Sequence, residues 1–201
     1  ALRMFGKSPG FTAIAVGSLA LGIGANTVIF TTAQHALFDR LHVPHPEQLR
    51  LLWNTNNEDV AHSFWGYFDH GPDGKRRTTS FSYPVYEQLR KENHALAELC
   101  AFKNGGPLTA TIDGQAESVT AQMVSGNFYA TMEVQPALGR AIAERDDGAP
   151  GSGPVVVISN EFWTTRFGRS PSVIGKTIDL NGTPVTVIGV NPPGFTGAWE
   201  A

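Results

Sequence analysis

A stretch near the end of the chain, residues 168–182, contains half of a phosphate-binding motif. Phosphate-binding loops have the pattern G-x-x-x-x-G-K-[ST], in which backbone amides point at the phosphate oxygens. Residues 175–177 (Gly-Lys-Thr) match its second half, but Ser170 stands where the first glycine belongs. Pro171 follows it and has no amide hydrogen to donate. The motif is therefore incomplete, and we expect no nucleotide site.

The residues around this stretch predict a different local structure. A phosphate loop follows a buried strand and opens a helix. Here a short helix over 159–168 is expected upstream, because a serine N-cap begins it and a glycine ends it. Downstream, 177–180 and 185–188 flank the turn dipeptide Asn-Gly, which is typical of a β-hairpin. The Gly-Lys-Thr sequence is thus predicted to lead into a hairpin.

Two groups of histidines and acids could be combined into a metal site. The first is His42, His45 and Glu47; the second is His62, Asp69, His70 and Asp73. Zinc sites need three or four converging ligands on firm elements, whereas these residues lie in predicted loops beside prolines. We expect solvated histidines and no metal. The sequence also contains no G-x-S-x-G, H-E-x-x-H or Cys-His nucleophile signature, so no catalytic residue, no cofactor and no anchored hydrolase is predicted.

The N-terminal part of the chain contains a long segment without charged residues. Residues 8–38 contain no Asp, Glu, Lys or Arg. Twenty helical residues span about 30 Å, the thickness of the hydrocarbon core of a bilayer. We predict a transmembrane helix over 10–37, preceded by an interfacial segment over 1–9. Arg3 and Lys7 place the N-terminus in the cytosol by the positive-inside rule, and the rest of the chain outside.

Two other interpretations of the uncharged run stay open. A cleaved signal peptide also has a basic start, an apolar run and small residues before its cleavage site, although this run is long for one. A buried helix of a soluble protein is the third possibility. Within the run, Ser18, Gly22 and Asn26 recur every four residues and share one helix face. Small and polar residues in this spacing predict a face that packs on another membrane helix.

The remaining chain, 44–201, predicts a domain of mixed hairpins and short helices. The expected elements are a strand over 49–53, a long polar loop over 54–80, a helix over 82–93, a hairpin of 108–112 with 119–123, a short helix over 126–132, and a strand over 155–158. This order indicates an α+β fold. Phe162, Trp163 and Phe167 are expected in its core. The net charge of −3 gives no basic field for nucleic acid, and the single cysteine, Cys100, excludes an internal disulfide.

Several stretches resemble one known family in the same order. The segment ALRMFGKSPGFTAIAVGSLALGIGANTVIF resembles the first transmembrane region of MacB/FtsX-like ABC-transporter permeases, most closely the duplicated ADOP-type permeases. Four later stretches are similar to successive motifs of the MacB-type periplasmic core domain: SYPVYEQLRKEN, VSGNFYATMEVQPALGRAI, VVVISNEFWTTRFG and PSVIGKTIDLNGTPVTVIGVNPPGF. The specificity lies in the number and order of these motifs.

The resemblance implies a non-enzymatic permease subunit in the cytoplasmic (inner) membrane, with its main domain periplasmic or extracellular. A separate ABC ATPase subunit would hydrolyse ATP, and this chain would couple hydrolysis to substrate export or extraction. The implied partners are that ATPase, the lipid bilayer and other permease helices, possibly in a dimer. The chain is expected to be a fragment cut before further spans. The alternative is a membrane-anchored extracytoplasmic adaptor without a transport role.

Overall fold

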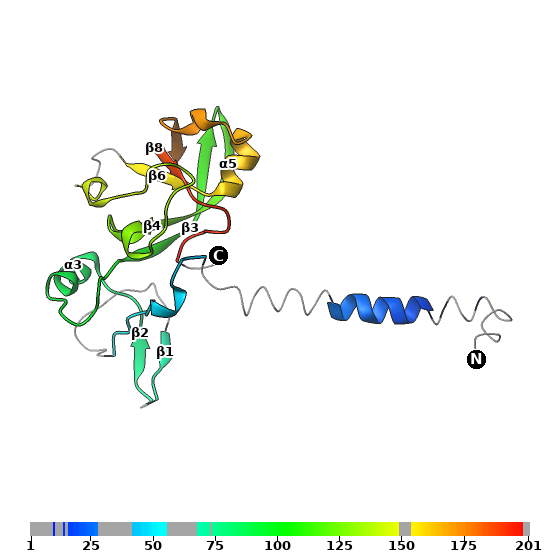
Figure 1. Ribbon diagram of the computed structural model, residues 1–201, viewed down its shortest axis with the longest axis horizontal. Helices are drawn as coiled ribbons and strands as arrows, with labels where there is room; N and C mark the ends of the chain where they lie inside the picture. The colour runs from blue at the N-terminus through cyan, green and yellow to red at the C-terminus, as the bar shows by residue number, and fades with distance from the viewer. Residues whose placement is uncertain are drawn as a thin grey trace. The chain divides into compact units, whose positions relative to one another are not determined.

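The computed structural model describes residues 10, 14, 16–27, 42–55, 68–72, 74–148 and 154–198. The chain divides into two compact units, Ala1–Arg40 and Leu41–Ala201. In the first unit, residues 16–27 are helical and exposed (Figure 1, blue). Among the residues that the structure describes, none of the helices combines the length and the apolar composition that a membrane span requires. The predicted segment 1–9 and much of the predicted span 10–37 lie outside the described residues.

The second unit is built on a six-stranded sheet with the order β4-β3-β7-β8-β5, in which β6 also pairs with β8. The strands are β3 (Phe102–Ile112), β4 (Gln115–Val124), β5 (Leu138–Gly139), β6 (Val155–Ile158), β7 (Thr177–Leu180) and β8 (Thr183–Val190). The β6–β8 pair is parallel and the other pairs are antiparallel. The mixed sheet with short helices confirms the predicted α+β class.

Two tight hairpins fix the register of the long strands. Asp113 and Gly114 join β3 to β4 with φ angles of 50° and 79°, and Asn181 and Gly182 join β7 to β8 with 50° and 82°. Two successive residues with positive φ define a type I′ turn, whose twist matches that of paired strands. Both predicted hairpins are confirmed. The Gly-Lys-Thr sequence leads into β7, so it opens a strand and no helix.

Short helices connect the strands. They are α3 (Tyr83–Lys91), α4 (Phe128–Thr131) and α5 (Asn160–Phe167), with the 3-10 turns η1 (Pro46–Gln48), η2 (Glu144–Asp146) and η3 (Pro171–Val173). The predicted caps of α5 are confirmed. The Ser159 hydroxyl accepts a hydrogen bond from the Phe162 amide at 3.1 Å, and Gly168 ends the helix with a φ of 55°.

The sheet carries two groups of buried apolar side chains. Beneath α5, Trp163 packs with Val173, Val187 and other residues of β6, β7 and β8, and Phe162 and Phe167 lie against this group as predicted. The second group is centred on Phe128 of α4, which is 1% exposed and packs near Phe195. These two clusters hold α4 and α5 on the sheet.

Two predictions between residues 49 and 80 are wrong. Residues 49–53 form no strand; among the described residues, the ladder contact in this region is the single bridge between Asn54 and Thr78. The predicted loop over 54–80 contains a hairpin of β1 (Phe68–His70) and β2 (Arg76–Thr78). An Asp69–Arg77 ion pair at 2.6 Å joins these polar strands, which lack the apolar alternation that sequence patterns detect.

Candidate functional site

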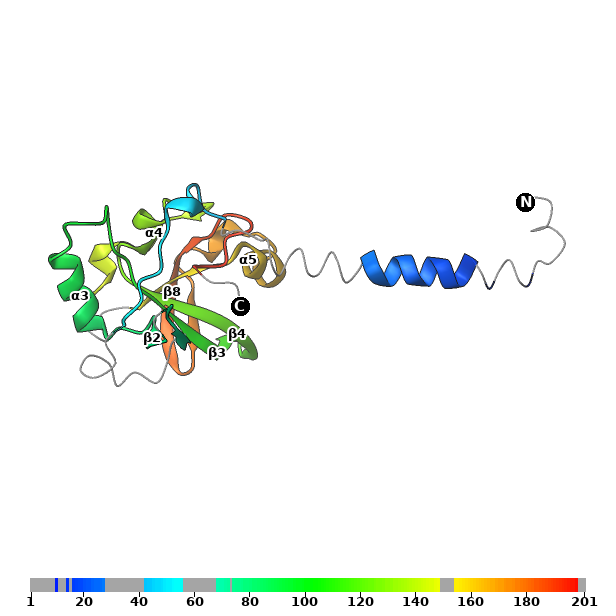
Figure 2. The ribbon, with the colours of Figure 1, turned by 90° about the horizontal axis from the view of Figure 1, so that it is seen from below.

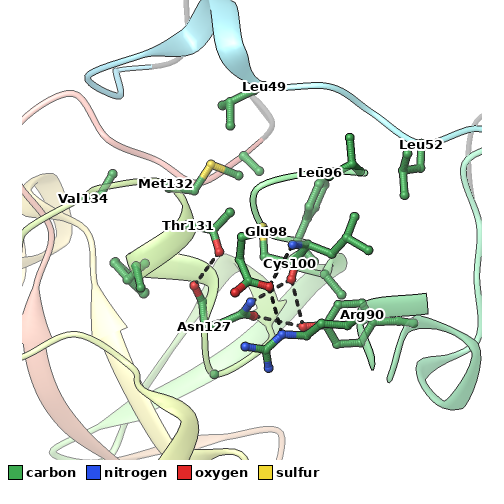
Figure 3. Close-up of a pocket in the computed structure, with 18 of the residues that line it drawn as sticks. Leu49, Leu52, Arg90, Leu96, Glu98, Cys100, Asn127, Thr131, Met132 and Val134 are labelled. Carbon is green, nitrogen blue, oxygen red and sulfur yellow. Dashed lines mark hydrogen bonds and ion pairs between the residues drawn. The ribbon is translucent and has the colours of Figure 1, made fainter. Parts of the chain in front are cut away.

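The second unit carries a groove of about 1600 Å³. Its lining comes from η1 and the residues after it, from α3, from the segment between α3 and β3, from α4, and from η2. Figure 3 shows side chains that follow η1, of α3, of the segment between α3 and β3, and in and around α4, all around the groove. The groove is therefore assembled from segments that are distant in the sequence.

Leucine side chains give the groove its apolar character. Leu51, Leu52, Leu89 and Leu96 line it, and each is 37–43% exposed. Among the described residues of the second unit, the other exposed large apolar side chains are Tyr83, Met123 and Ile174, and these lie outside the groove. Exposed apolar side chains gathered in one concave place indicate a binding surface, whereas scattered ones carry no such meaning.

The buried Asn127 side chain lines the groove and is hydrogen-bonded through both its oxygen and its nitrogen. The buried Asn127 carbonyl oxygen accepts hydrogen bonds from the Tyr86 hydroxyl at 2.9 Å and the Ser125 hydroxyl at 2.8 Å. Its amide nitrogen donates to the Leu99 carbonyl at 2.7 Å. Because buried polar groups with partners are stable and rigid, this network fixes α3 and the start of β3 relative to α4.

Three charged side chains of the groove form one ion-pair network. The Arg90 guanidinium contacts the Glu98 carboxylate at 3.1 Å and the Glu144 carboxylate at 2.5 Å. The hydrogen bond from Arg90, with a second from the Leu99 amide, lowers the pKa of Glu98. Arg90 thus joins α3 to the segment before β3, through Glu98, and to η2, through Glu144. Its positive charge is balanced by these two carboxylates.

The single cysteine also lines the groove, without the features of a nucleophile. Cys100 is partly buried, and burial raises the pKa of its thiol to about 11. Reactive cysteines are thiolates with a depressed pKa. At neutral pH the Cys100 side chain is therefore a protonated, largely apolar wall of the groove.

The histidines and acids that could form a metal site are dispersed. His45 contacts Glu47 at 3.5 Å and Glu133 at 4.0 Å, and about half of its side chain is exposed. Asp69 is paired with Arg77, while His62 and Asp73 lie outside the described residues. Over the part of the chain that the structure describes, no three His, Cys, Asp or Glu side chains converge as metal ligands.

The predicted packing residues Ser18, Gly22 and Asn26 all lie in the helical stretch 16–27 and are exposed. A side chain added at Gly22 would meet no atom within 4 Å. Their role in helix packing stays a prediction. Sequence reasoning missed the groove itself, because its leucines and ion pairs come from separate segments; the only local signal was the apolar side of the helix over 82–93.

Comparisons with known proteins bear on the family. No curated protein matches the chain. One similar solved structure is the extracellular domain of the noncanonic ABC-type transporter YknZ from Gram-positive bacteria, with 24% identity and a TM-score of 0.49 over 58% of this chain and 59% of that chain. Another is the periplasmic region of MacB from Actinobacillus actinomycetemcomitans, with 17% identity and a TM-score of 0.48 over 56% of this chain and 50% of that chain.

The coverage by these structures is partial, since the chain spans 59% and 50% of their lengths. The family described as the MacB-like periplasmic core domain matches residues 12–200. That range includes most of the uncharged N-terminal run and nearly all of the second unit. The chain therefore belongs to the MacB-like periplasmic core domain family.

Proposed function

We propose that the chain is the extracytoplasmic core domain of an ABC-type transporter permease, held in the cytoplasmic membrane by a span over residues 10–37. The family match over residues 12–200 carries this proposal. The absence of charge over residues 8–38, with Arg3 and Lys7 before it, supports a cytosolic N-terminus. A separate ATPase subunit would hydrolyse ATP, and the permease would transmit the resulting movement to this domain.

In this proposal the groove beside α3 binds the apolar part of the exported substrate. Its exposed leucines offer an apolar surface, and Arg90 is already paired with Glu98 and Glu144 inside the domain. The protonated Cys100 thiol suits binding better than catalysis. We therefore propose a non-enzymatic role in export or extraction.

The test uses the full permease with its ATPase, reconstituted in lipid vesicles. Leu96→Glu places a charge in the groove and should lower the stimulation of ATP turnover by substrate several-fold, because a charge opposes apolar binding. Ile174→Glu is the matched control, since Ile174 is similarly exposed but lies outside the groove. It should leave the stimulation intact.

Each negative result has a separate meaning. Equal, wild-type turnover in both variants would remove the groove from substrate binding. If ATP turnover did not depend on the permease at all, the coupling proposal would be wrong, and the chain would be a membrane-anchored adaptor instead.

A further inference from the structure

Helix α3 (Tyr83–Lys91) is attached to the second unit in a different way from α4 and α5. Within the described residues, the two buried apolar clusters contain side chains of α4 and α5 but none of α3. The one buried side chain of α3, Tyr86, belongs to neither cluster. Figure 2, like Figure 1, shows α3 at the rim of the unit, on the side away from α5. Polar contacts therefore hold this helix in place.

Three side chains on one face of α3 make these contacts. Tyr83, Tyr86 and Arg90 are spaced by three and four residues, so they lie on the same side of the helix. Their partners outside the helix, at 2.6, 2.9 and 2.5 Å, are Asp147, Asn127 and Glu144 respectively. Tyr83 is exposed and Arg90 is only partly buried. Water therefore competes for the first and the last of these contacts.

The segment that carries Glu144 and Asp147 is firmly fixed on the domain. A Cβ atom added at Gly126, just before α4, would lie 2.6 Å from the Glu144 Cα atom, so the two backbones are in direct contact. The Gly126 amide also donates to the Asp147 carboxylate at 3.0 Å. Asp146 of η2 accepts two hydrogen bonds from Arg140. The joint between α3 and η2 thus has one rigid side, and α3 is the side that can move.

The segment after α3 belongs to the same moving part. Arg90 pairs with Glu98 of that segment at 3.1 Å, and this ion pair need not break when α3 moves. Leu89 of α3 and Leu96 of the segment line the groove, while Leu52 lines it from the segment after η1. Movement of α3 therefore changes the distance between the apolar walls of the groove.

We propose that residues 83–98 form a movable wall of the groove. The contacts of Tyr83 with Asp147 and of Arg90 with Glu144 are its latch, and they hold the wall in the position that the structure shows, which we call closed. When the latch breaks, water satisfies the four side chains, and the wall moves without disturbing either apolar cluster.

A movable wall gives the groove a means of regulating its ligand. A ligand that packs on leucines from both walls favours the closed position, because it gains all of its contacts only there. Release of the latch favours the open position and the exit of the ligand. This regulatory role rests on the proposed function, whereas the movement of the wall does not.

The single cysteine of the chain can report the movement. Cys100 lines the groove and follows Leu99, whose carbonyl accepts a hydrogen bond from the buried Tyr86 hydroxyl. Opening of the wall withdraws Tyr86 from this place and lets a reagent reach the thiol. In the full chain, the rate at which N-ethylmaleimide modifies Cys100 at fixed pH therefore measures the population of the open position.

Two substitutions release the two contacts of the latch separately. Tyr83→Phe removes the hydroxyl that binds Asp147 and leaves the groove lining unchanged, since Tyr83 lies outside it. It should raise the modification rate about fivefold, the change expected for the loss of one hydrogen bond of ordinary strength. Arg90→Met should raise the rate at least as much. Lys91→Met is the matched control, because it removes the same charge from an exposed neighbour outside the latch, and it should not change the rate.

A variant that strains another part of the fold separates wall movement from global unfolding. At Gly189 an added Cβ atom would lie 2.2 Å from the Arg140 carbonyl oxygen, in the contact between β5 and β8. Gly189→Ala should therefore lower the melting temperature but leave the modification rate of Cys100 unchanged. Tyr83→Phe should do the reverse.

Two kinds of result would overturn the proposal. One is a wild-type modification rate in both Tyr83→Phe and Arg90→Met, and the other is an equal rise in Lys91→Met or Gly189→Ala. Neither measurement uses substrate or ATP. A rigid wall would leave the groove as a substrate site, and unchanged ATP turnover in Leu96→Glu would leave the movement of the wall intact, so the two proposals fail separately.

Discussion

The carboxylate of Asp146 accepts three hydrogen bonds within the second unit. It accepts two hydrogen bonds from Arg140, at 2.6 and 2.8 Å, and one from the Ala143 amide at 2.9 Å. Its side chain is only 8% exposed. The Arg140 guanidinium is the main reason that the pKa of Asp146 lies below its ordinary value. These bonds fix the turn η2, which carries Glu144 to the groove.

Acid should therefore remove the stabilisation that Asp146 provides. A carboxylate with a depressed folded-state pKa stabilises the fold above its ordinary pKa of about 4 and loses this effect as the pH falls through the folded value. Asp146→Asn should lower the free energy of unfolding by about 1–3 kcal/mol at neutral pH. The substitution should cost less at an acidic pH below the folded-state pKa of Asp146, where the wild-type carboxyl is also protonated. Urea unfolding at both pH values checks this.

Glu161→Gln serves as the control, because Glu161 is exposed at the start of α5 and is not part of this network. It should change the stability by a few tenths of a kcal/mol at most. An equal loss of unfolding free energy in Asp146→Asn at both pH values would contradict the prediction. The loss would then come from the changed side-chain geometry and not from the missing charge.

Residue patterns in the sequence predicted local contacts better than distant ones. The Ser159 cap of α5 could be predicted because its partner, the Phe162 amide, lies three residues away. The contact between Arg90 and Glu144 could not, because the two residues are 54 positions apart and only the folded sheet brings them together. The groove depends on contacts between residues that are distant in the sequence, so its lining could not be predicted from the sequence.

Among the elements, β5 and β8 approach each other through paired glycines. Gly139 lies opposite Gly189. A Cβ atom added at Gly189 would lie 2.2 Å from the Arg140 carbonyl oxygen, and one at Gly139 would lie 2.3 Å from the Ile188 carbonyl oxygen. These are backbone atoms and cannot move aside cheaply. The pair therefore sets how closely β5 packs on the sheet.

Gly189→Ala should lower the free energy of unfolding by about 2–3 kcal/mol, because the added methyl group forces β8 away from β5. Gly105→Ala is the matched control. It lies in β3, and its added Cβ would meet the Ala121 carbonyl oxygen at 3.1 Å, so a small shift relieves the contact. Thermal or urea unfolding of both variants measures the difference, and equal losses would contradict the packing argument.

The strand elements divide into those that the sequence specifies locally and those that it does not. Asp113-Gly114 and Asn181-Gly182 predict their hairpins because a type I′ turn requires positive φ at both central positions. The parallel pairing of β6 with β8 has no such signal. The apolar sequence of Val155–Ile158 is compatible with a parallel or an antiparallel partner strand. Local patterns therefore gave the elements but only part of the sheet order.

For the whole molecule, the predicted topology can be tested independently of the groove. A reporter enzyme that is active only outside the cytosol, fused after residue 55, should be active, because Arg3 and Lys7 hold the N-terminus inside. The protein should remain with membranes after alkaline extraction. Release of a shortened chain into the soluble fraction would indicate instead a cleaved signal peptide, the alternative that the sequence left open.

The face formed by Ser18, Gly22 and Asn26 should matter only when the permease is assembled. Glycine lets helix backbones approach closely, and the serine and asparagine side chains can hydrogen-bond across the contact. Cross-helix hydrogen bonds in membranes contribute only about 0.6 kcal/mol on average, so Asn26→Leu should have a mild effect. Gly22→Leu should lower transport-coupled ATP turnover strongly while insertion stays normal, because a branched side chain separates the helices. Leu19→Ile, on another face, should do little. Equal, wild-type turnover in Gly22→Leu and Leu19→Ile would mean that this face contacts lipid and plays no part in coupling.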